Sequence, residues 1–444
     1  MVEIKRNKIS LNDYDYKSDI KNRILMAQFT TLDLRFLEEI LYSPLKIAIS
    51  KLSKNLNISE EKLIELAHKF SLGGFLKIQG NEIIVDKEMR KYYESQILKF
   101  DEEFTPGMEF LQGVLKKVPI QVLPNWYSIS RASNNIFESL VEKYLLTPQI
   151  FQRYFQDIHL GDPVLSAMVK TVYDAPDFKM FGSDLIDKHG LSREQFEENM
   201  LYLEFNLLCC LSYEKVDDEW KEIVTPFQEW REYLRFVKNT ETVPLEKDAK
   251  IARCYPSDFS FVETLSSELS LMSNGLPSSN KDSADLIDKL RLLKFVDMAD
   301  GKFCVLEAGL DWLKMTLENQ ALFIYRQPLN CLCIEHLPSH LCIERIIREA
   351  ERSIARVLHK GWVYFDDFIK GVIVPLSEQT TVMLKKVGKT WKYTLPEYSE
   401  EEKKLIKATI FDWLPKVGIV ATGSHAGKDC FYVTPFGASI FGAR

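Results

Sequence analysis

The hydrophobic and polar positions of this chain repeat one pattern four times: an amphipathic helix, a short apolar strand, a polar turn and a second strand. In the first copy, Leu63, Leu66, Ala67 and Phe70 follow the i, i+3, i+4, i+7 spacing of a helix that packs on a core. The paired strands fall at residues 70–78 and 82–86, 207–213 and 222–227, 295–298 and 303–306, and 417–421 and 430–437. This recurrence indicates a repeated domain.

The repeated segment predicts the fold class. A helix that leads into a two-stranded ribbon is typical of the second half of a winged helix. We therefore expect a mainly α protein with small β-hairpins (α+β), built as a tandem array of winged helix-turn-helix domains. The expected parts are a polar N-terminal arm (1–29), winged helix 1 (30–100), a helical connector broken by prolines (101–160), an acidic winged helix 2 (161–236), a linker (237–257), a degraded winged helix 3 (258–320), a connector (321–344) and winged helix 4 with an extra β-ribbon (345–444).

Capping residues mark where helices begin. Ser192 and Gln195 are spaced to form a capping box at the third helix of winged helix 2. Thr225-Pro226 and Thr434-Pro435 each follow a ribbon, so each threonine is expected to cap the next helix, with proline at its first position. These residues are interpreted as structural signals rather than as a functional site.

Composition places the chain among globular proteins. A hydrophobic share of 46%, with 12% aromatic residues, is enough for buried cores. No apolar run approaches the roughly 18 residues that a membrane helix needs, and the first residues lack the apolar core of a signal peptide. The eight cysteines do not form a disulfide framework. We therefore expect a cytoplasmic protein with reduced thiols.

Charge is unevenly distributed along the chain. Residues 1–100 carry 17 basic and 14 acidic side chains, and residues 345–444 carry 16 and 11. The segment between them, residues 101–344, carries 24 basic and 39 acidic side chains. Simple electrostatics would bring nucleic acid to the ends and repel it from the middle, where a protein partner is expected instead.

No catalytic motif stands out, so we expect a protein that is not an enzyme, with no cofactor and no small-molecule substrate. Gly388-Lys389-Thr390 resembles the end of a phosphate-binding loop, but Met383 occupies the position where that loop needs a glycine. The glycine-rich segment 423–428 joins two strands, which favours a wing tip over a phosphate site. An enzyme with an unrecognised site remains the third alternative.

One cluster has the residue types of a zinc site. Five possible ligands lie within twelve residues: Cys331, Cys333, His336, His340 and Cys342. The Cys-x-Cys spacing is one residue shorter than the usual structural site, and the cysteines alternate with apolar neighbours. We therefore expect core residues and no bound metal.

The residues best suited to nucleic acid lie in the last expected domain. Four arginines are spaced 3, 4 and 4 residues apart, as on one helix face: Arg345, Arg348, Arg352 and Arg356. Four lysines and a tryptophan crowd one ribbon, a combination suited to phosphate contact and base stacking: Lys385, Lys386, Lys389, Lys392 and Trp391. The alternative is a solvated surface with no ligand.

The third helix of a winged helix is its usual DNA reader. In winged helix 2 its expected exposed face is acidic, with Glu194, Glu197, Glu198 and Glu204, and the wing tip 217–219 is acidic too. Carboxylates facing phosphates oppose binding, so this domain is not expected to enter a groove. In winged helix 1 the exposed face of the third helix carries both acidic and basic residues, so its charge neither favours nor opposes DNA binding.

The C-terminal segment 411–420, Phe-Asp-Trp-Leu-Pro-Lys-Val-Gly-Ile-Val, followed by 433–437, resembles winged-helix segments of helicase-associated proteins. These include the non-catalytic regions of XPB-type helicases and of their TFIIH partner subunit. The resemblance covers about 50 residues and implies the fold. It implies no helicase activity, because no motor is present. The chain as a whole resembles an uncharacterised cytoplasmic family of the Chlamydiae, which implies a bacterial origin.

Two functions remain open from the sequence. The first is a non-enzymatic array of winged helices that binds nucleic acid through its basic ends, in transcription or genome maintenance. The second is a protein-interaction scaffold that does not bind nucleic acid. The arginine stripe and the lysine ribbon favour the first, and the acidic middle favours the second.

Overall fold

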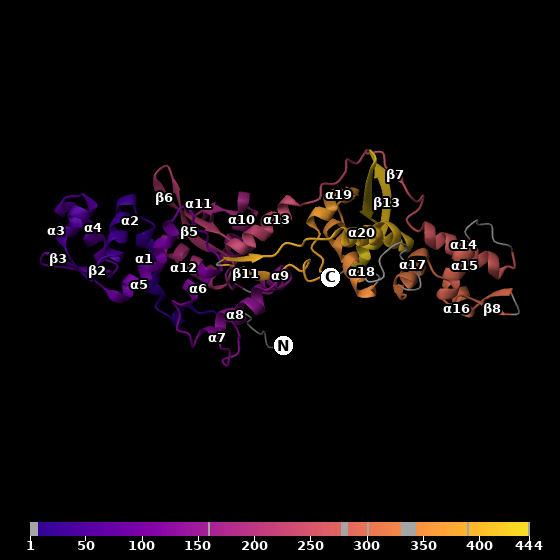
Figure 1. The fold of residues 1–444 in the computed structure, drawn as a ribbon, viewed down its shortest axis with the longest axis horizontal. Helices are drawn as coiled ribbons and strands as arrows, with labels where there is room; N and C mark the ends of the chain where they lie inside the picture. The colour runs from indigo at the N-terminus through magenta and orange to yellow at the C-terminus, as the bar shows by residue number, and fades with distance from the viewer. Residues whose placement is uncertain are drawn as a thin grey trace. The chain divides into compact units, whose positions relative to one another are not determined.

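The computed structural model of the chain describes residues 8–158, 160–276, 283–299, 302–329, 343–388 and 390–442 (Figure 1). The chain divides into two compact units. Unit 1 contains the residues up to Arg235 together with Met383–Tyr393, and unit 2 contains Phe236–Val382 and the residues from Thr394 onward. Helices predominate and the strands form small antiparallel sheets, so the chain has the α+β fold that the pattern predicts.

The first half of unit 1 is a three-stranded antiparallel sheet covered by helices. Its strands, in the sheet order β1–β3–β2, are β1 (Lys46–Ala48), β2 (Leu76–Gln79) and β3 (Glu82–Val85). Its helices are α2 (Thr31–Leu41), α3 (Ile49–Leu56), α4 (Glu60–Ser71), α5 (Lys87–Gln96) and the 3-10 helix η2 (Ile97–Phe100). Leu63, Leu66, Ala67 and Phe70 of α4 are buried in the core, which confirms their helical spacing.

The second half of unit 1 repeats this order of elements. Its strands, in the order β4–β6–β5, are β4 (Met180–Phe181), β5 (Cys210–Val216) and β6 (Glu219–Thr225). Its helices are α10 (Pro163–Asp174), α11 (Gly182–His189), α12 (Arg193–Phe205) and α13 (Gln228–Asn239). Between the halves lie the short helices that the prolines predict: α6 (Met108–Leu115), α7 (Leu123–Trp126), α8 (Ile136–Leu140), the π-helix η3 (Val141–Leu145) and α9 (Pro148–Asp157).

The segment expected as a polar N-terminal arm contains a buried helix. The 3-10 turn η1 (Leu11–Asp13) precedes α1 (Tyr16–Met26), and α1 packs against α12. Asp19 and Arg23 of α1 are buried together with Met26. The expectation of an arm is therefore wrong for these residues, because their charged side chains have partners inside unit 1.

Unit 2 contains the same order of elements once more. It comprises α18 (Glu344–Glu351), η6 (Arg352–Val357), β10 (Val363–Tyr364), α19 (Phe365–Phe368), η7 (Ile369–Gly371), α20 (Glu400–Ala408), η8 (Thr409–Trp413), η9 (Leu414–Val417), β13 (Val420–His425), β14 (Lys428–Val433) and α21 (Pro435–Phe441). The sheet order is β10–β14–β13–β7. Strand β7 (Ala252–Arg253) comes from the expected linker, whose end is therefore part of this sheet.

A shorter copy of the same order of elements precedes α18 in the sequence of unit 2. Its elements are α14 (Ser260–Ser273), α15 (Ser283–Leu292), β8 (Val296–Ala299), β9 (Lys302–Val305), α16 (Glu307–Leu313) and α17 (Leu317–Tyr325). Strands β8 and β9 form a two-stranded sheet, as expected for a degraded copy. Both copies share one hydrophobic core, in which Trp312 and Trp413 are almost fully buried.

The extra ribbon consists of β11 (Leu384–Val387) and β12 (Thr390–Tyr393). The ribbon was expected to belong with residues 345–444, but it packs as part of unit 1. Figure 1 shows the orange strand β11 beside the magenta helices of that unit. The ribbon is inserted between α19 and α20, so its sequence neighbours belong to unit 2.

The predicted ribbons and caps can be compared with the structure directly. All four predicted strand pairs are antiparallel ribbons. Ser192 and Gln195 form the capping box, and Thr434 caps α21 by accepting the amide of Gly437 at 3.0 Å. The expectation for Thr225-Pro226 is wrong, because Thr225 ends β6 and α13 begins at Gln228.

Candidate nucleic-acid interface

The ribbon β11–β12 is fixed to unit 1 through one of its faces. The amide of Leu384 donates to the carbonyl of Leu146 at 2.8 Å, and the hydroxyl of Tyr393 donates to the carbonyl of Leu145 at 2.7 Å. The Trp391 ring meets the Phe137 ring edge-on, with centroids 6.1 Å apart. These contacts bury Leu384 and Tyr393 and give the ribbon a rigid base.

The other face of the ribbon carries unpaired positive charge. Lys385 lies directly opposite Lys392, and side-chain alternation places both on the face away from Leu384 and Tyr393. Lys386 lies opposite the half-buried Trp391, and the same alternation places this pair on the anchored face together with Leu384 and Tyr393. The three lysines are exposed and form no hydrogen bond or ion pair with the described residues. Lys389, the fourth predicted lysine, lies outside the described residues.

Two of the four predicted arginines are held inside unit 2. Arg348 donates to Glu351 at 2.9 Å and to the carbonyl of Tyr325 at 3.0 Å. Arg356 donates to the carbonyl of Thr240 at 2.7 Å. Both guanidinium groups therefore stabilise the unit and leave few donors for a ligand.

The remaining two arginines do not restore the expected stripe. Helix α18 ends at Glu351 and the chain continues as a 3-10 helix from Arg352, which changes the angle between successive side chains. Arg352 pairs with Glu349 at 2.6 Å. Arg345 is exposed and has no bond to the described part of the chain. The expected single helical face of four arginines is therefore wrong.

The acidic face expected on α12 also needs correction. Glu194 and Glu198 are exposed, but Glu197 and Glu204 are fully buried. The guanidinium of Arg23 donates to Glu197 at 2.7 Å and to Glu204 at 2.9 Å. Helix α12 therefore faces α1 with two of its four carboxylates. Only Glu194 and Glu198 therefore remain on the exposed side of this helix.

Neither a cluster of metal-ligating side chains nor an activated thiol at Cys209 or Cys210 occurs among the described residues. The cluster from Cys331 to Cys342 lies outside them, and no group of three metal-ligating side chains occurs within residues 8–158, 160–276, 283–299, 302–329, 343–388 and 390–442. Burial raises the pKa of both Cys209 and Cys210 and keeps them as inert thiols.

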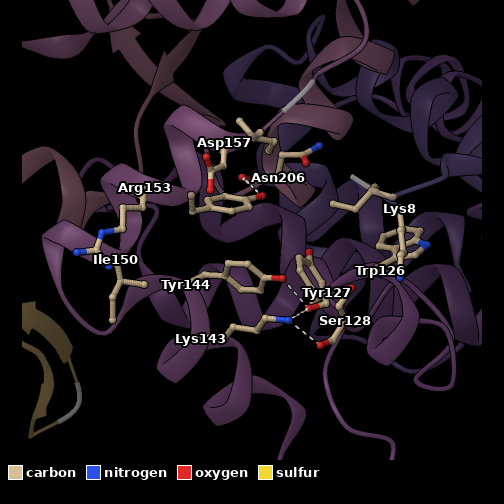
Figure 2. Close-up of a pocket in the computed structure, with 13 residues that line it drawn as sticks. Lys8, Trp126, Tyr127, Ser128, Lys143, Tyr144, Ile150, Arg153, Asp157 and Asn206 are labelled. Atoms are coloured by element: carbon tan, nitrogen blue, oxygen red, sulfur yellow. Dashed lines mark hydrogen bonds between the residues drawn. The ribbon is translucent and has the colours of Figure 1, made fainter. Parts of the chain in front are cut away.

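Unit 1 contains a pocket with a volume of about 430 Å³ that no sequence motif predicts. It lies beside η3 and α9, and Figure 2 shows Tyr127 and Tyr144 together with Lys143 in its wall. Its residues come from four segments between residues 8 and 206. Because these segments are far apart in the sequence, no local pattern marks the pocket.

Comparison of the chain with protein-family models, curated proteins and solved structures finds no match. Among the described residues, no helix is long and apolar enough to cross a membrane. Function must therefore be argued from the geometry of the ribbon and the pocket.

Proposed function

We propose that the repeated copies are winged-helix domains arranged in tandem. The supporting observation is topological: helix, strand, helix, helix and ribbon follow one another three times. Each time the first strand pairs with the last strand of the ribbon: β1 with β3, β4 with β6, and β10 with β14. The reduced copy of unit 2 keeps two helices and the ribbon. The resemblance of residues 411–437 to helicase-associated winged helices agrees with this assignment.

We further propose that the protein binds nucleic acid, without catalysis, through the outward face of β11–β12, in transcription or genome maintenance. The observation that carries this proposal is the opposition of Lys385 and Lys392. Like charges directly opposite each other destabilise a ribbon by several tenths of a kcal/mol. No described carboxylate pairs with either lysine. A phosphate placed between them would turn this repulsion into two attractions.

The neighbouring residues support contact with a polynucleotide. Trp391 and Lys386 lie opposite each other on the anchored face, where Lys386 is exposed and Trp391 is only half-buried, so part of the tryptophan remains accessible. Base stacking on an aromatic side chain contributes roughly 1–3 kcal/mol per base and tolerates any sequence. The ribbon is anchored to unit 1 through the face that carries Leu384 and Tyr393, so little ordering of the backbone is needed on binding. The surface therefore suits contact with phosphates and an unpaired base rather than sequence readout.

Fluorescence anisotropy with labelled single-stranded and duplex oligonucleotides tests this function. Replacing the four ribbon lysines, including Lys389, with alanine should weaken binding at least tenfold, irrespective of sequence. The control variant replaces the exposed Glu194 and Glu198 with alanine and should not weaken binding. Absence of binding by the wild-type protein at micromolar concentration and low salt would overturn the proposal.

The second candidate function is a protein-interaction scaffold, and one observation favours it. Met298 and Phe303 lie opposite each other on β8 and β9, and 51% and 41% of their surfaces are exposed. They extend the face that buries Val296 beyond the edge of the core. This function is supported by two results together. The wild-type protein should self-associate in sedimentation without binding nucleic acid, and replacing Met298 and Phe303 with glutamate should abolish the self-association.

A further inference from the structure

The pocket in unit 1 has the size of a small-molecule site. Its volume of about 430 Å³ falls within the range of roughly 300–1,000 Å³ that is typical of ligand pockets. It is lined by η3, α9, the end of α7 and the residues at 8–9 and 206. All of these belong to unit 1.

Three tyrosine rings form one side of the pocket. The centroids of Tyr127 and Tyr144 are 6.2 Å apart, and those of Tyr144 and Tyr154 are 4.8 Å apart. Each hydroxyl donates to a main-chain carbonyl: Tyr144 to Tyr127 at 2.6 Å, Tyr127 to Phe205 at 2.7 Å, and Tyr154 to Asn206 at 3.1 Å. The rings are therefore fixed. Tyr127 is buried behind the others, and the partly exposed Tyr144 and Tyr154 offer aromatic surface, rather than hydroxyl donors, to a ligand.

Positive charge outnumbers negative charge in the lining. Lys8, Lys143 and Arg153 line the pocket with one carboxylate, Asp157. The Lys143 ammonium donates to the carbonyls of Tyr127 at 3.0 Å and of Ser128 at 2.6 Å, which holds it at the pocket wall (Figure 2). An ammonium has three protons, so one of them remains for a ligand.

No described carboxylate forms an ion pair with the three cations of the pocket. Lys8 and Arg153 are exposed and form no hydrogen bond or ion pair with the described residues. Partial burial lowers the pKa of Lys143, and the positive charge of Lys8 lowers it further. An anion among these three groups would relieve their mutual repulsion.

We infer that this pocket binds a nucleotide, with the base against the tyrosine rings and the phosphate near Lys8, Lys143 and Arg153. An inorganic anion would fill only a small part of this volume, and it would make no use of the aromatic side chains in the wall. The three cations exclude a quaternary ammonium ligand, for which aromatic cages are otherwise suited. A neutral apolar ligand would leave the two lysines and the arginine without an anionic partner among the described residues.

The nucleotide could be free or part of a single strand. The residues that bind the ribbon follow the pocket residues directly: Lys143 and Tyr144 line the pocket, and the carbonyls of Leu145 and Leu146 accept from the ribbon. A strand whose phosphates contact the ribbon could place one unstacked base in the pocket. The strand source rests on the proposed function, whereas the free nucleotide does not.

Calorimetric titration of the full chain with adenosine monophosphate and with adenosine tests the inference. The monophosphate should bind, and adenosine should bind at least tenfold more weakly. A Lys8→Glu, Arg153→Glu variant should lose at least tenfold in affinity for the monophosphate, while a control with Lys77→Glu and Lys87→Glu should not. All four side chains are exposed, so folding is preserved in both variants. No binding at millimolar monophosphate, or equal binding by the pocket variant, would overturn the inference.

A single-stranded 12-mer separates the two sources. Two variants are compared: the pocket variant (Lys8→Glu, Arg153→Glu) and the ribbon variant, in which alanine replaces the four ribbon lysines. If the strand supplies the nucleotide, both variants lose affinity for the 12-mer, and the monophosphate competes with the 12-mer for the wild-type protein. If the free nucleotide is the ligand, the pocket variant loses the monophosphate alone. Binding of the monophosphate with no binding of any strand would keep the pocket and overturn the proposed function.

Discussion

Replacing Arg23 with methionine is expected to destabilise unit 1 by about 3–5 kcal/mol, the usual cost of breaking a buried ion pair. Arg23 is fully buried and donates to Glu197 and Glu204, which are fully buried too. Methionine has a similar volume but no donor. Glu197 keeps its contact with Arg193, and Glu204 keeps the amide of Leu211 at 3.1 Å. These remaining partners hold the loss within that range.

Urea unfolding of the full chain, with hydrogen exchange of peptides from α1 and α12, measures this loss in unit 1. The matched control is Lys62→Met, which breaks the exposed pair with Glu65 and should cost at most about 1 kcal/mol. Adding Glu197→Gln and Glu204→Gln to Arg23→Met should recover part of the loss, because the two buried carboxylates that lost Arg23 are then neutral. Equal effects of Arg23→Met and Lys62→Met would refute the reasoning.

Three further predictions concern other parts of the chain. Burial raises the pKa of Glu229 from 4.5 to about 7, so the folded state holds this proton more tightly than the unfolded state. Its contribution to the free energy of unfolding should therefore fall by about 3 kcal/mol between pH 4.5 and pH 8. Glu229→Gln should remove this pH dependence in denaturation curves. An unchanged pH dependence in the variant would contradict the prediction. Tyr393→Phe removes the hydrogen bond to the carbonyl of Leu145 and should weaken the packing of the ribbon on unit 1 by about 1 kcal/mol. Hydrogen exchange in residues 384–393 should then become faster. Unchanged exchange would show that this hydrogen bond contributes nothing. Elemental analysis should find no zinc, and one zinc per chain that is lost on replacing Cys331 and Cys333 with serine would overturn this.

The ribbons and most caps were predictable because they depend on neighbouring residues. The alternation of strand residues and the spacing of Ser192 and Gln195 act over a few positions, and the structure confirms both. The cap expected at Thr225 failed because a strand continues through that residue and takes its place in the sheet. Local signals of this kind give the elements but not their partners.

The candidate site was less predictable because its residues are joined by long-range contacts. Arg23 is separated by 174 residues from Glu197 and by 181 from Glu204, so the acidic residues of α12 read as an exposed face. Similarly, Arg356 meets the carbonyl of Thr240, 116 residues away. The spacing of charged residues on a helix shows which ones share a face. It does not show what packs against that face.

The salt dependence of oligonucleotide binding tests the central claim most directly. If the ribbon neutralises phosphates, the logarithm of the association constant should fall linearly with the logarithm of salt concentration. Each lost phosphate contact on a single strand reduces the slope by about 0.7, so replacing Lys385, Lys386, Lys389 and Lys392 should flatten it by up to about 3. The Lys77→Glu, Lys87→Glu control should keep the wild-type slope. Equal slopes for the wild type and the ribbon variant would contradict the account.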